Sequence, residues 1–98
     1  MKSNHYKKDR QARETIIKDI IGYGNIIRSI EIDKGHINGA EIHKLSDTGI
    51  ITIYNKNSGK LVTKLIARCG QAKRFGYINK ELLDKCYYNT VIMHYNEI

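Results

Sequence analysis

The sequence predicts an α+β domain, in which an antiparallel meander of about four strands lies between an N-terminal and a C-terminal helix. Apolar residues recur at helical spacing near both ends of the chain. The middle of the chain alternates in polarity and contains two turn signals. No proline, repeat or low-complexity segment divides the sequence. Residues 1–98 are therefore expected to form a single domain with one core, with residues 1–8 flexible.

The first helix is expected over about Arg10 to Ile21. Asp9 suits the N-cap, because its carboxylate accepts hydrogen bonds from free backbone N–H groups. Gly22 suits the C-terminal end, where a left-handed backbone conformation is common. The predicted buried face of this helix consists of Ile16, Ile17, Ile20 and Ile21.

Four segments have the features of β-strands. The third and fourth segments follow turn signals, Ser46-Asp47-Thr48-Gly49 and Asn55–Gly59. The fourth segment is ambiguous, because its apolar residues also fit one face of a helix. The hairpin loop before it and its β-branched residues favour a strand. The expected strands are Ile26 to Asp33, Glu41 to Leu45, Ile50 to Tyr54 and Leu61 to Ala67.

The stretch from Cys69 to Asn79 is expected to be irregular, with a short extension of the sheet at Lys73 to Tyr77. Asn79 suits the N-cap of a last helix that continues to about His94. We expect both helices to cover one face of the sheet, which leaves the other face free to bind. The predicted inward stripe of the last helix is Leu82, Leu83, Cys86, Tyr87, Thr90, Val91 and His94.

Positive charge is concentrated in the middle of the chain. The net charge is +7, and Thr48 to Lys80 contains seven Lys or Arg residues and no acidic residue. Such a block predicts an anionic partner: a nucleotide, a nucleic acid or an acidic protein. No apolar run approaches the roughly 18 residues that span a membrane, and the N-terminus lacks the apolar region of a signal peptide. We therefore expect no membrane partner and a cytoplasmic protein.

Strand alternation predicts a cationic surface. Lys60, Lys64 and Arg68 would project from one face of the fourth strand, and nearby tyrosines would stack bases. The alternative interpretation is a solvated edge strand that lysines protect from aggregation. The predicted ligand-binding residues are Lys60, Lys64, Arg68, Lys73, Arg74, Tyr54 and His43.

Two histidines, His36 and His43, flank a glycine-containing loop. In a metal-independent ribonuclease, either could serve as general acid or base while Arg68 stabilises the transition state. The alternative is that both are turn or surface residues without chemistry. No metal-ligand spacing or cofactor motif is present, so neither a metal nor a cofactor is expected. Cys69 and Cys86 do not form a CxxC pair and are expected to be reduced thiols.

The stretch GAEIHKLSDTGIITIYNKNSGKLVTKLIARCGQAKRF, with DKGHING before it and YNEI at the C-terminus, resembles a group of short phage and prophage proteins of low-GC Gram-positive bacteria. Those proteins carry proline and an aliphatic residue where this chain has Cys69 and Ala72, which weakens any role for Cys69. The resemblance implies a phage accessory protein in the cytoplasm of an infected or lysogenic host. Its implied role is anti-defence, through a host defence protein or through the nucleotide signal that such a protein reads.

A more distant resemblance, in architecture, is to the RelE/barnase-like ribonuclease fold. Three functions therefore stay open. The first is a non-catalytic protein that binds an anionic ligand through a basic sheet face. The second is a ribonuclease. The third is a homo-oligomer, such as a dimeric structural protein of the phage particle, paired through an exposed strand.

Overall fold

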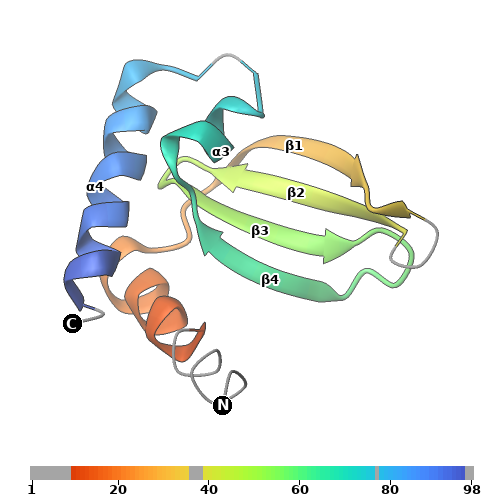
Figure 1. Ribbon diagram of the computed structural model, residues 1–98, viewed down its shortest axis with the longest axis horizontal. Coiled ribbons are helices and arrows are strands. Elements are labelled where there is room, and N and C mark those ends of the chain that lie inside the picture. Colours follow the sequence, from red (N-terminus) through yellow and green to blue (C-terminus); the bar gives the residue numbers. More distant parts are fainter. Residues whose placement is uncertain (1–9, 36–38, 77, 97–98) are drawn as a thin grey trace.

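The computed structural model describes residues 10–35, 39–76 and 78–96. It confirms the α+β prediction: an antiparallel sheet of four strands in the order β1-β2-β3-β4 lies between an N-terminal and a C-terminal helix (Figure 1). The elements are the N-terminal helix (residues 10–21), β1 (Ile26–Asp33), β2 (Ala40–Ser46), β3 (Ile50–Asn55), β4 (Leu61–Ile66), α3 (Cys69–Lys73) and α4 (Lys80–Asn96). The ambiguous fourth segment is thus a strand.

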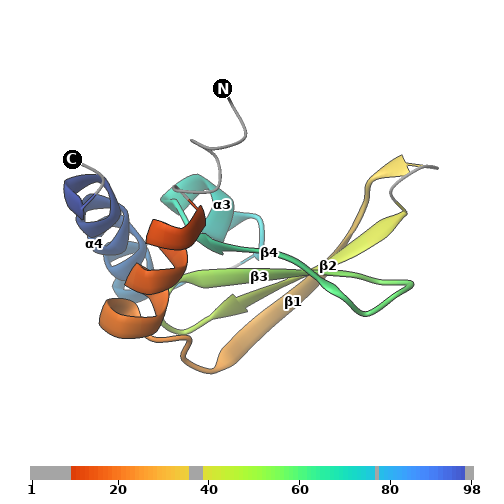
Figure 2. The same ribbon diagram turned by 90° about the horizontal axis from the view of Figure 1, so that it is seen from below.

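The helices gather at one end of the sheet (Figure 2). Helix α4 stands across the strand ends, α3 lies over one face, and the N-terminal helix lies beside the β4 edge (Figures 1 and 2). The opposite end of the sheet extends beyond the helices, and we call it the free end. The molecule is flat, with extents of 39 × 37 × 20 Å, so it is about two layers thick. No helix in the described part of the chain is long and apolar enough to cross a membrane.

The strand register defines two faces of the sheet, because successive side chains point to opposite sides. The core face carries Ile30, His43, Leu45, Ile51, Ile53 and Leu65. The opposite face, which we call the lysine face, carries Ser29, Glu31, Ile42, Lys44, Ile50, Thr52, Tyr54, Lys64 and Ile66. Its acidic residue, Glu31, forms a salt bridge with Lys56.

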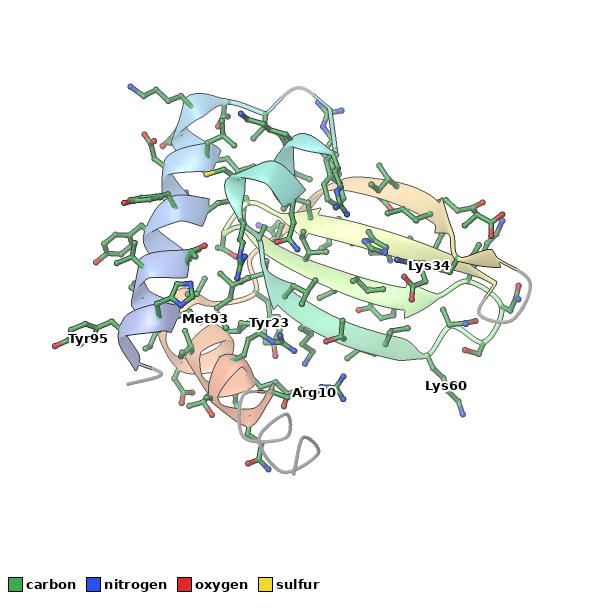
Figure 3. The ribbon with its side chains drawn as sticks, viewed as in Figure 1. Arg10, Tyr23, Lys34, Lys60, Met93 and Tyr95 are labelled. Carbon is green, nitrogen blue, oxygen red and sulfur yellow. The ribbon has the colours of Figure 1, made fainter. Side chains whose placement is uncertain are left out.

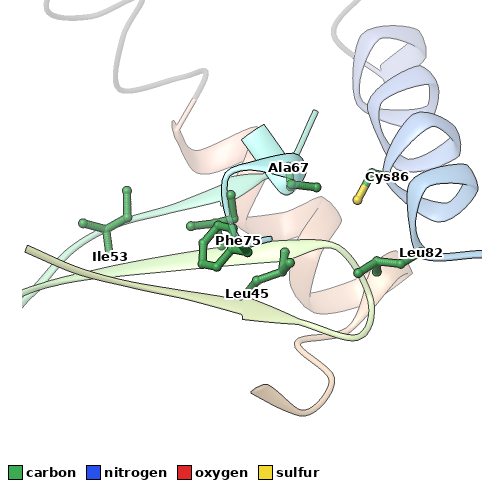
Figure 4. Close-up of a cluster of buried hydrophobic side chains, with 8 residues drawn as sticks. Leu45, Ile53, Ala67, Phe75, Leu82 and Cys86 are labelled. Carbon is green, nitrogen blue, oxygen red and sulfur yellow. The ribbon is translucent and has the colours of Figure 1, made fainter. Parts of the chain in front are cut away.

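The main hydrophobic cluster lies on the core face at the helical end (Figure 4). Phe75 and Ala72 cover Leu45 and its strand neighbours from the side of α3. Helix α4 closes the end of the cluster with two buried side chains. The buried members are Leu45, Ile51, Ile53, Ala67, Ala72, Phe75, Leu82 and Cys86.

A second cluster joins the N-terminal helix to the other side of the sheet. Ile16 and Ile17 pack against Ile50 and Ile66, which are direct cross-strand partners. Both partners point to the lysine-face side, two residues from Thr52 and Lys64 respectively. The expectation that both helices cover one face is therefore wrong. The N-terminal helix covers the helical end of the lysine face, and only the rest of that face is open.

The N-terminal helix ends in a wider turn than expected. Its last five residues, Ile17–Ile21, are a π-helix, and the Gly22 N–H donates to the Ile17 carbonyl at 2.6 Å. Gly22 ends the helix with φ +81°, as predicted. Because a π-turn holds more residues than an α-turn, the predicted isoleucine stripe breaks. Ile16 and Ile17 are buried, whereas Ile20 is 56% exposed.

Two other expectations fail near the C-terminus. Residues 73–76 do not extend the sheet: Lys73 ends the short helix α3, residues 74–76 form a turn, and residue 77 lies outside the described residues. Ala72 and Phe75, three residues apart, are both buried in the main cluster. The buried stripe of α4 also runs differently. Tyr87, Val91 and His94 are exposed, while Asn89 is buried. Met93 points toward the N-terminal helix and Tyr95 points away from the molecule (Figure 3).

Candidate functional site

A row of polar side chains crosses the lysine face from strand to strand. Ser29 pairs with Lys44, Lys44 pairs with Thr52, and Thr52 pairs with Lys64. Hydroxyl and ammonium groups therefore alternate across the four strands. The two lysines stand two strand spacings apart, which is roughly 10 Å. The row presents cations and hydroxyl groups at regular intervals on one surface.

Each lysine of the row lies against a tyrosine. The Nζ of Lys44 lies 5.1 Å from the ring centre of Tyr54, and the Nζ of Lys64 lies 4.9 Å from that of Tyr23. Lys64 also donates a hydrogen bond from Nζ to the Tyr23 hydroxyl oxygen, at 2.9 Å. A cation over an aromatic face is held in place without losing its charge. The tyrosines thus orient the lysines and add aromatic surface beside them.

The hydrogen bond to Tyr23 raises the pKa of Lys64 above its ordinary value. Partial burial opposes this shift, and nearby carboxylate and phenol groups, including Glu14, add to it. A raised amine pKa keeps the ammonium form across the neutral range. Lys64 is therefore a fixed positive charge on this face.

A network of hydrogen bonds from the β2–β3 turn positions Tyr23. The Thr48 hydroxyl donates to the Gly22 carbonyl at 2.8 Å and also lies 3.2 Å from the Tyr23 carbonyl. The Asp47 carboxylate accepts from the Asn25 N–H at 3.0 Å. The Asp47 N–H donates to the Asn25 carbonyl at 2.9 Å. The turn that joins two strands of the lysine face therefore also holds the loop that carries the Tyr23 ring.

A hollow of about 730 Å³ lies between the N-terminal helix and the Tyr23–Lys64 pair. Its lining mixes cationic, acidic and neutral side chains. Acidic residues in the hollow disfavour a phosphate there, whereas its polar groups suit the donors and acceptors of a base or a sugar. The lining consists of Gln11, Glu14, Thr15, Lys18, Asp19, Tyr23 and Lys64.

The predicted ligand-binding residues do not form one surface. Lys64 and Tyr54 lie on the lysine face. Lys60 lies in the loop before β4, at the free end of the sheet (Figure 3). Arg68 comes directly before α3, Lys73 ends that helix, and Arg74 follows it. These residues are dispersed partly because of a register shift between Ile53 and Tyr54. The shift limits the predicted alternation of side chains to part of the fourth strand.

The sequence patterns did not identify Ser29, Lys44 or Thr52 as binding residues. Lys44 and Thr52 could have been found, because the short β2–β3 turn fixes which residues face each other. Tyr23 depends on the packing of the Gly22–Asn25 loop, for which the sequence has no signal. Among the described residues, the salt bridges join Lys56 to Glu31 at 2.7 Å and Glu41 to Lys34 and His43. No salt bridge of that set includes Lys44 or Lys64.

The predicted ribonuclease residues are not brought together. His43 is buried on the core face, where its Nε2 donates to the Glu41 carboxylate at 3.1 Å. His43 stands in a row with Ile53 and Thr63, and roughly 16 Å of extended chain separates Thr63 from Arg68. Lys64 points to the opposite face. His36 lies outside the described residues.

In the described ranges, no three His, Cys, Asp or Glu side chains are grouped where they could hold a metal ion. Comparison of the chain with protein-family models, with curated proteins and with solved structures finds no match. The geometry of the lysine face is therefore the basis for assigning a function.

Proposed function

We propose that the protein is a non-catalytic binding protein for single-stranded nucleic acid, with RNA as the first choice, and that the lysine face is its binding surface. The observation that supports this most directly is the row Ser29-Lys44-Thr52-Lys64, in which each lysine lies against a tyrosine. Cationic side chains follow the phosphate backbone, and aromatic rings stack on bases. Both groups occur here on one side of a sheet.

A single strand fits this face better than a duplex does. The rings of Tyr54 and Tyr23 offer stacking surfaces, and only unpaired bases can turn toward them. An antiparallel sheet whose aromatic residues stack bases is a common platform for single-stranded RNA. The hydroxyl groups of Ser29 and Thr52 add hydrogen-bonding partners for phosphate or sugar oxygens.

The resemblance to phage proteins adds a setting for this proposal. In the cytoplasm of an infected bacterium, the lysine face would bind the RNA or the nucleotide signal on which a defence system depends. A host protein with an acidic surface is the alternative partner there, because it presents the same charge. The residues that we propose to make the contacts are the same for either partner.

The test is a comparison of two double variants that remove the same charge. Lys44→Ala/Lys64→Ala changes the lysine face, whereas Lys60→Ala/Lys73→Ala removes two exposed lysines elsewhere. Fluorescence polarisation with labelled single-stranded RNA of mixed sequence measures the affinity. Because hydrogen bonds to charged groups contribute about 1.5–3 kcal/mol each, we expect the first variant to bind at least tenfold more weakly. The control should lose less than about threefold.

Two outcomes would overturn the proposal. One is an equal loss in both double variants, which would mean that only overall charge matters. The other is RNA cleavage by the purified protein that His43→Ala abolishes, which would make the protein a ribonuclease. Binding to mononucleotides but not to oligonucleotides would keep the face and change the ligand to a nucleotide signal.

The tyrosines provide an independent test. Tyr54→Ala should weaken binding to single-stranded RNA by about 1–3 kcal/mol, which is the contribution of one stacked base. Tyr54→Phe keeps the ring and should bind like the wild-type protein. If Tyr54→Ala also binds like wild type, this ring does not stack on a base.

A further inference from the structure

A separate cavity of about 140 Å³ lies where three helices meet the end of β4. The N-terminal helix contributes Arg13, the start of α3 contributes Arg68 and Gln71, and α4 contributes Met93. Leu65 and Ile66 form the strand wall. None of the four residues of the polar row on the lysine face lines this cavity.

Arg13 has an unsatisfied donor in this region. Its Nε is buried and has no hydrogen-bond partner among the described residues. Its Nη2 donates to the Thr63 hydroxyl at 3.3 Å, which is a long hydrogen bond. A buried guanidinium donor without a partner is costly, and native proteins rarely leave one unpaired. The atom therefore needs an acceptor that the surrounding chain does not supply.

Two more donors line the same cavity. The Gln71 side-chain carbonyl oxygen already accepts from the Arg68 backbone N–H at 3.0 Å, so its NH₂ group remains to donate. The side chain of Arg68 is exposed and so lies at the mouth of the cavity. No carboxylate belongs to the lining. Two guanidinium groups and an amide therefore surround a space that contains no negative charge.

We propose that this cavity binds a phosphate group, held by Arg13, Arg68 and Gln71. Phosphate oxygens accept from the planar guanidinium in pairs. Arg13 Nε is closed off from water in the present side-chain position, so it would donate to a phosphate once the side chain turns toward the cavity. The volume far exceeds the roughly 10–15 Å³ that a single water requires, so the cavity has room for a phosphate group. The phosphate is either free inorganic phosphate or the terminal phosphate of a nucleotide or oligonucleotide.

The first experiment uses inorganic phosphate as the probe. Isothermal titration of the full chain at constant ionic strength, with chloride as the reference anion, measures its affinity. Arg68→Gln should bind phosphate at least tenfold more weakly and keep its fold, because this side chain is exposed. Arg28→Gln removes an exposed arginine outside the cavity and should bind like the wild type.

Arg13 is tested by exchange for lysine. Arg13→Lys keeps the charge and loses the planar pair of donors, so it should also bind phosphate at least tenfold more weakly. If Arg13 variants do not fold, the comparison of Arg68→Gln with Arg28→Gln still decides the question. Equal phosphate affinity in wild type and Arg68→Gln, or no phosphate binding by the wild type, would overturn the proposal.

A second comparison identifies the source of the phosphate. If the cavity takes a terminal phosphate, a 5′-phosphorylated oligonucleotide should bind at least tenfold tighter than its 5′-hydroxyl form, and Arg68→Gln should remove that difference. If it takes free phosphate, the two forms should bind equally while inorganic phosphate still binds. Lys44→Ala/Lys64→Ala should retain phosphate binding, so failure at the lysine face and failure at the cavity are distinguishable.

Discussion

The buried hydroxyl of Ser46 connects the sheet to the loop that carries Tyr23. Ser46 is 1% exposed, and its oxygen accepts from the backbone N–H groups of Ile50 and Thr48, at 3.0 and 3.3 Å. Its own hydrogen is then directed to the Thr48 hydroxyl oxygen, at 2.9 Å. Thr48 in turn donates to the Gly22 carbonyl. The hydroxyl groups of Ser46 and Thr48 therefore form the hydrogen bonds that link the start of β3 to the loop that carries Tyr23.

Replacing Ser46 by alanine should destabilise the fold, because it leaves the buried Ile50 N–H without its acceptor. We expect the free energy of unfolding to fall by about 1–3 kcal/mol in urea denaturation. Ser29→Ala, at an exposed position, should change it by less than about 0.5 kcal/mol. Equal stability of the two variants would show that the Ser46 hydroxyl does not hold this turn.

The two cysteines differ in their surroundings. Burial raises the pKa of the Cys86 thiol to about 11, and the nearby Cys69 adds to the shift. Cys69 is only partly buried, and its thiol lies 3.6 Å from the Leu83 carbonyl. Because the thiolate is the reactive form, iodoacetamide at pH 8 should label Cys69 first and Cys86 only on unfolding. Mass spectrometry of the labelled peptides checks this order, and faster labelling of Cys86 would contradict it.

The raised pKa of Cys86 also makes the stability of the fold depend on pH. The folded state keeps the Cys86 proton up to about pH 11, whereas the unfolded thiol loses it near 9.0. The stabilisation is therefore complete below about pH 9 and is lost as the pH rises toward 11. Unfolding in urea between these values should show a decrease in stability that is smaller in Cys86→Ala.

At the scale of elements, the close approach of α4 to the β2–β3 turn fixes how the helix sits. Gly49 has φ +85°, and a Cβ at this position would lie 3.0 Å from the Cys86 sulfur and 3.4 Å from the Asn89 side-chain nitrogen. Asn89 donates from that nitrogen to the Thr48 carbonyl at 2.6 Å. Glycine is required here for both its backbone conformation and its missing side chain.

Gly49→Ala should therefore lower the free energy of unfolding by at least about 1–3 kcal/mol, since it adds strain as well as a steric contact. Gly70→Ala is the matched control, because Gly70 lies in α3 with ordinary φ and open space around it. That change should be neutral or stabilise by up to about 1 kcal/mol. Thermal or urea unfolding of both variants gives the comparison, and a stable Gly49→Ala would show that α4 can shift.

The elements that the sequence predicted are those with a strong local pattern. The four strands, the first helix with its Gly22 end and the last helix all follow from polarity, turn residues and capping. Three features depend instead on tertiary packing: the π-turn that exposes Ile20, the short helix α3, and the face of α4 that turns inward. Of the proposed site, Lys64 and Tyr54 followed from strand alternation. Tyr23 did not, because its position depends on the packing of a loop against a distant turn.

At the scale of the whole molecule, the two faces of one sheet differ in chemistry. The core face holds the apolar cluster and the buried His43, and the lysine face holds the cation row. The net charge of +7 adds a general attraction for polyanions that many proteins would show. A salt titration separates that attraction from contacts made by the lysine face.

The logarithm of the RNA affinity should fall linearly with the logarithm of the salt concentration, with a slope of about −0.7 for each phosphate contact on a single strand. Lys44→Ala/Lys64→Ala should reduce the steepness of that slope by about 1.4, because it removes two contacts. Lys60→Ala/Lys73→Ala should leave the slope within error of the wild-type value. An unchanged slope in the first variant would mean that phosphates do not contact this row.

The cation row runs across the strands, so its existence depends on how the strands are paired. A shift of one residue in the β2–β3 or the β3–β4 hairpin would turn a lysine toward the apolar cluster and bring an aliphatic side chain to the surface. A misaligned sheet would therefore lose the ligand even if every strand still formed. The β2–β3 turn aligns Lys44 with Thr52 and also holds the Tyr23 loop, so a folding error at that one turn would remove both halves of the surface together. Retention of the ligand would thus report on the fidelity of strand pairing during folding.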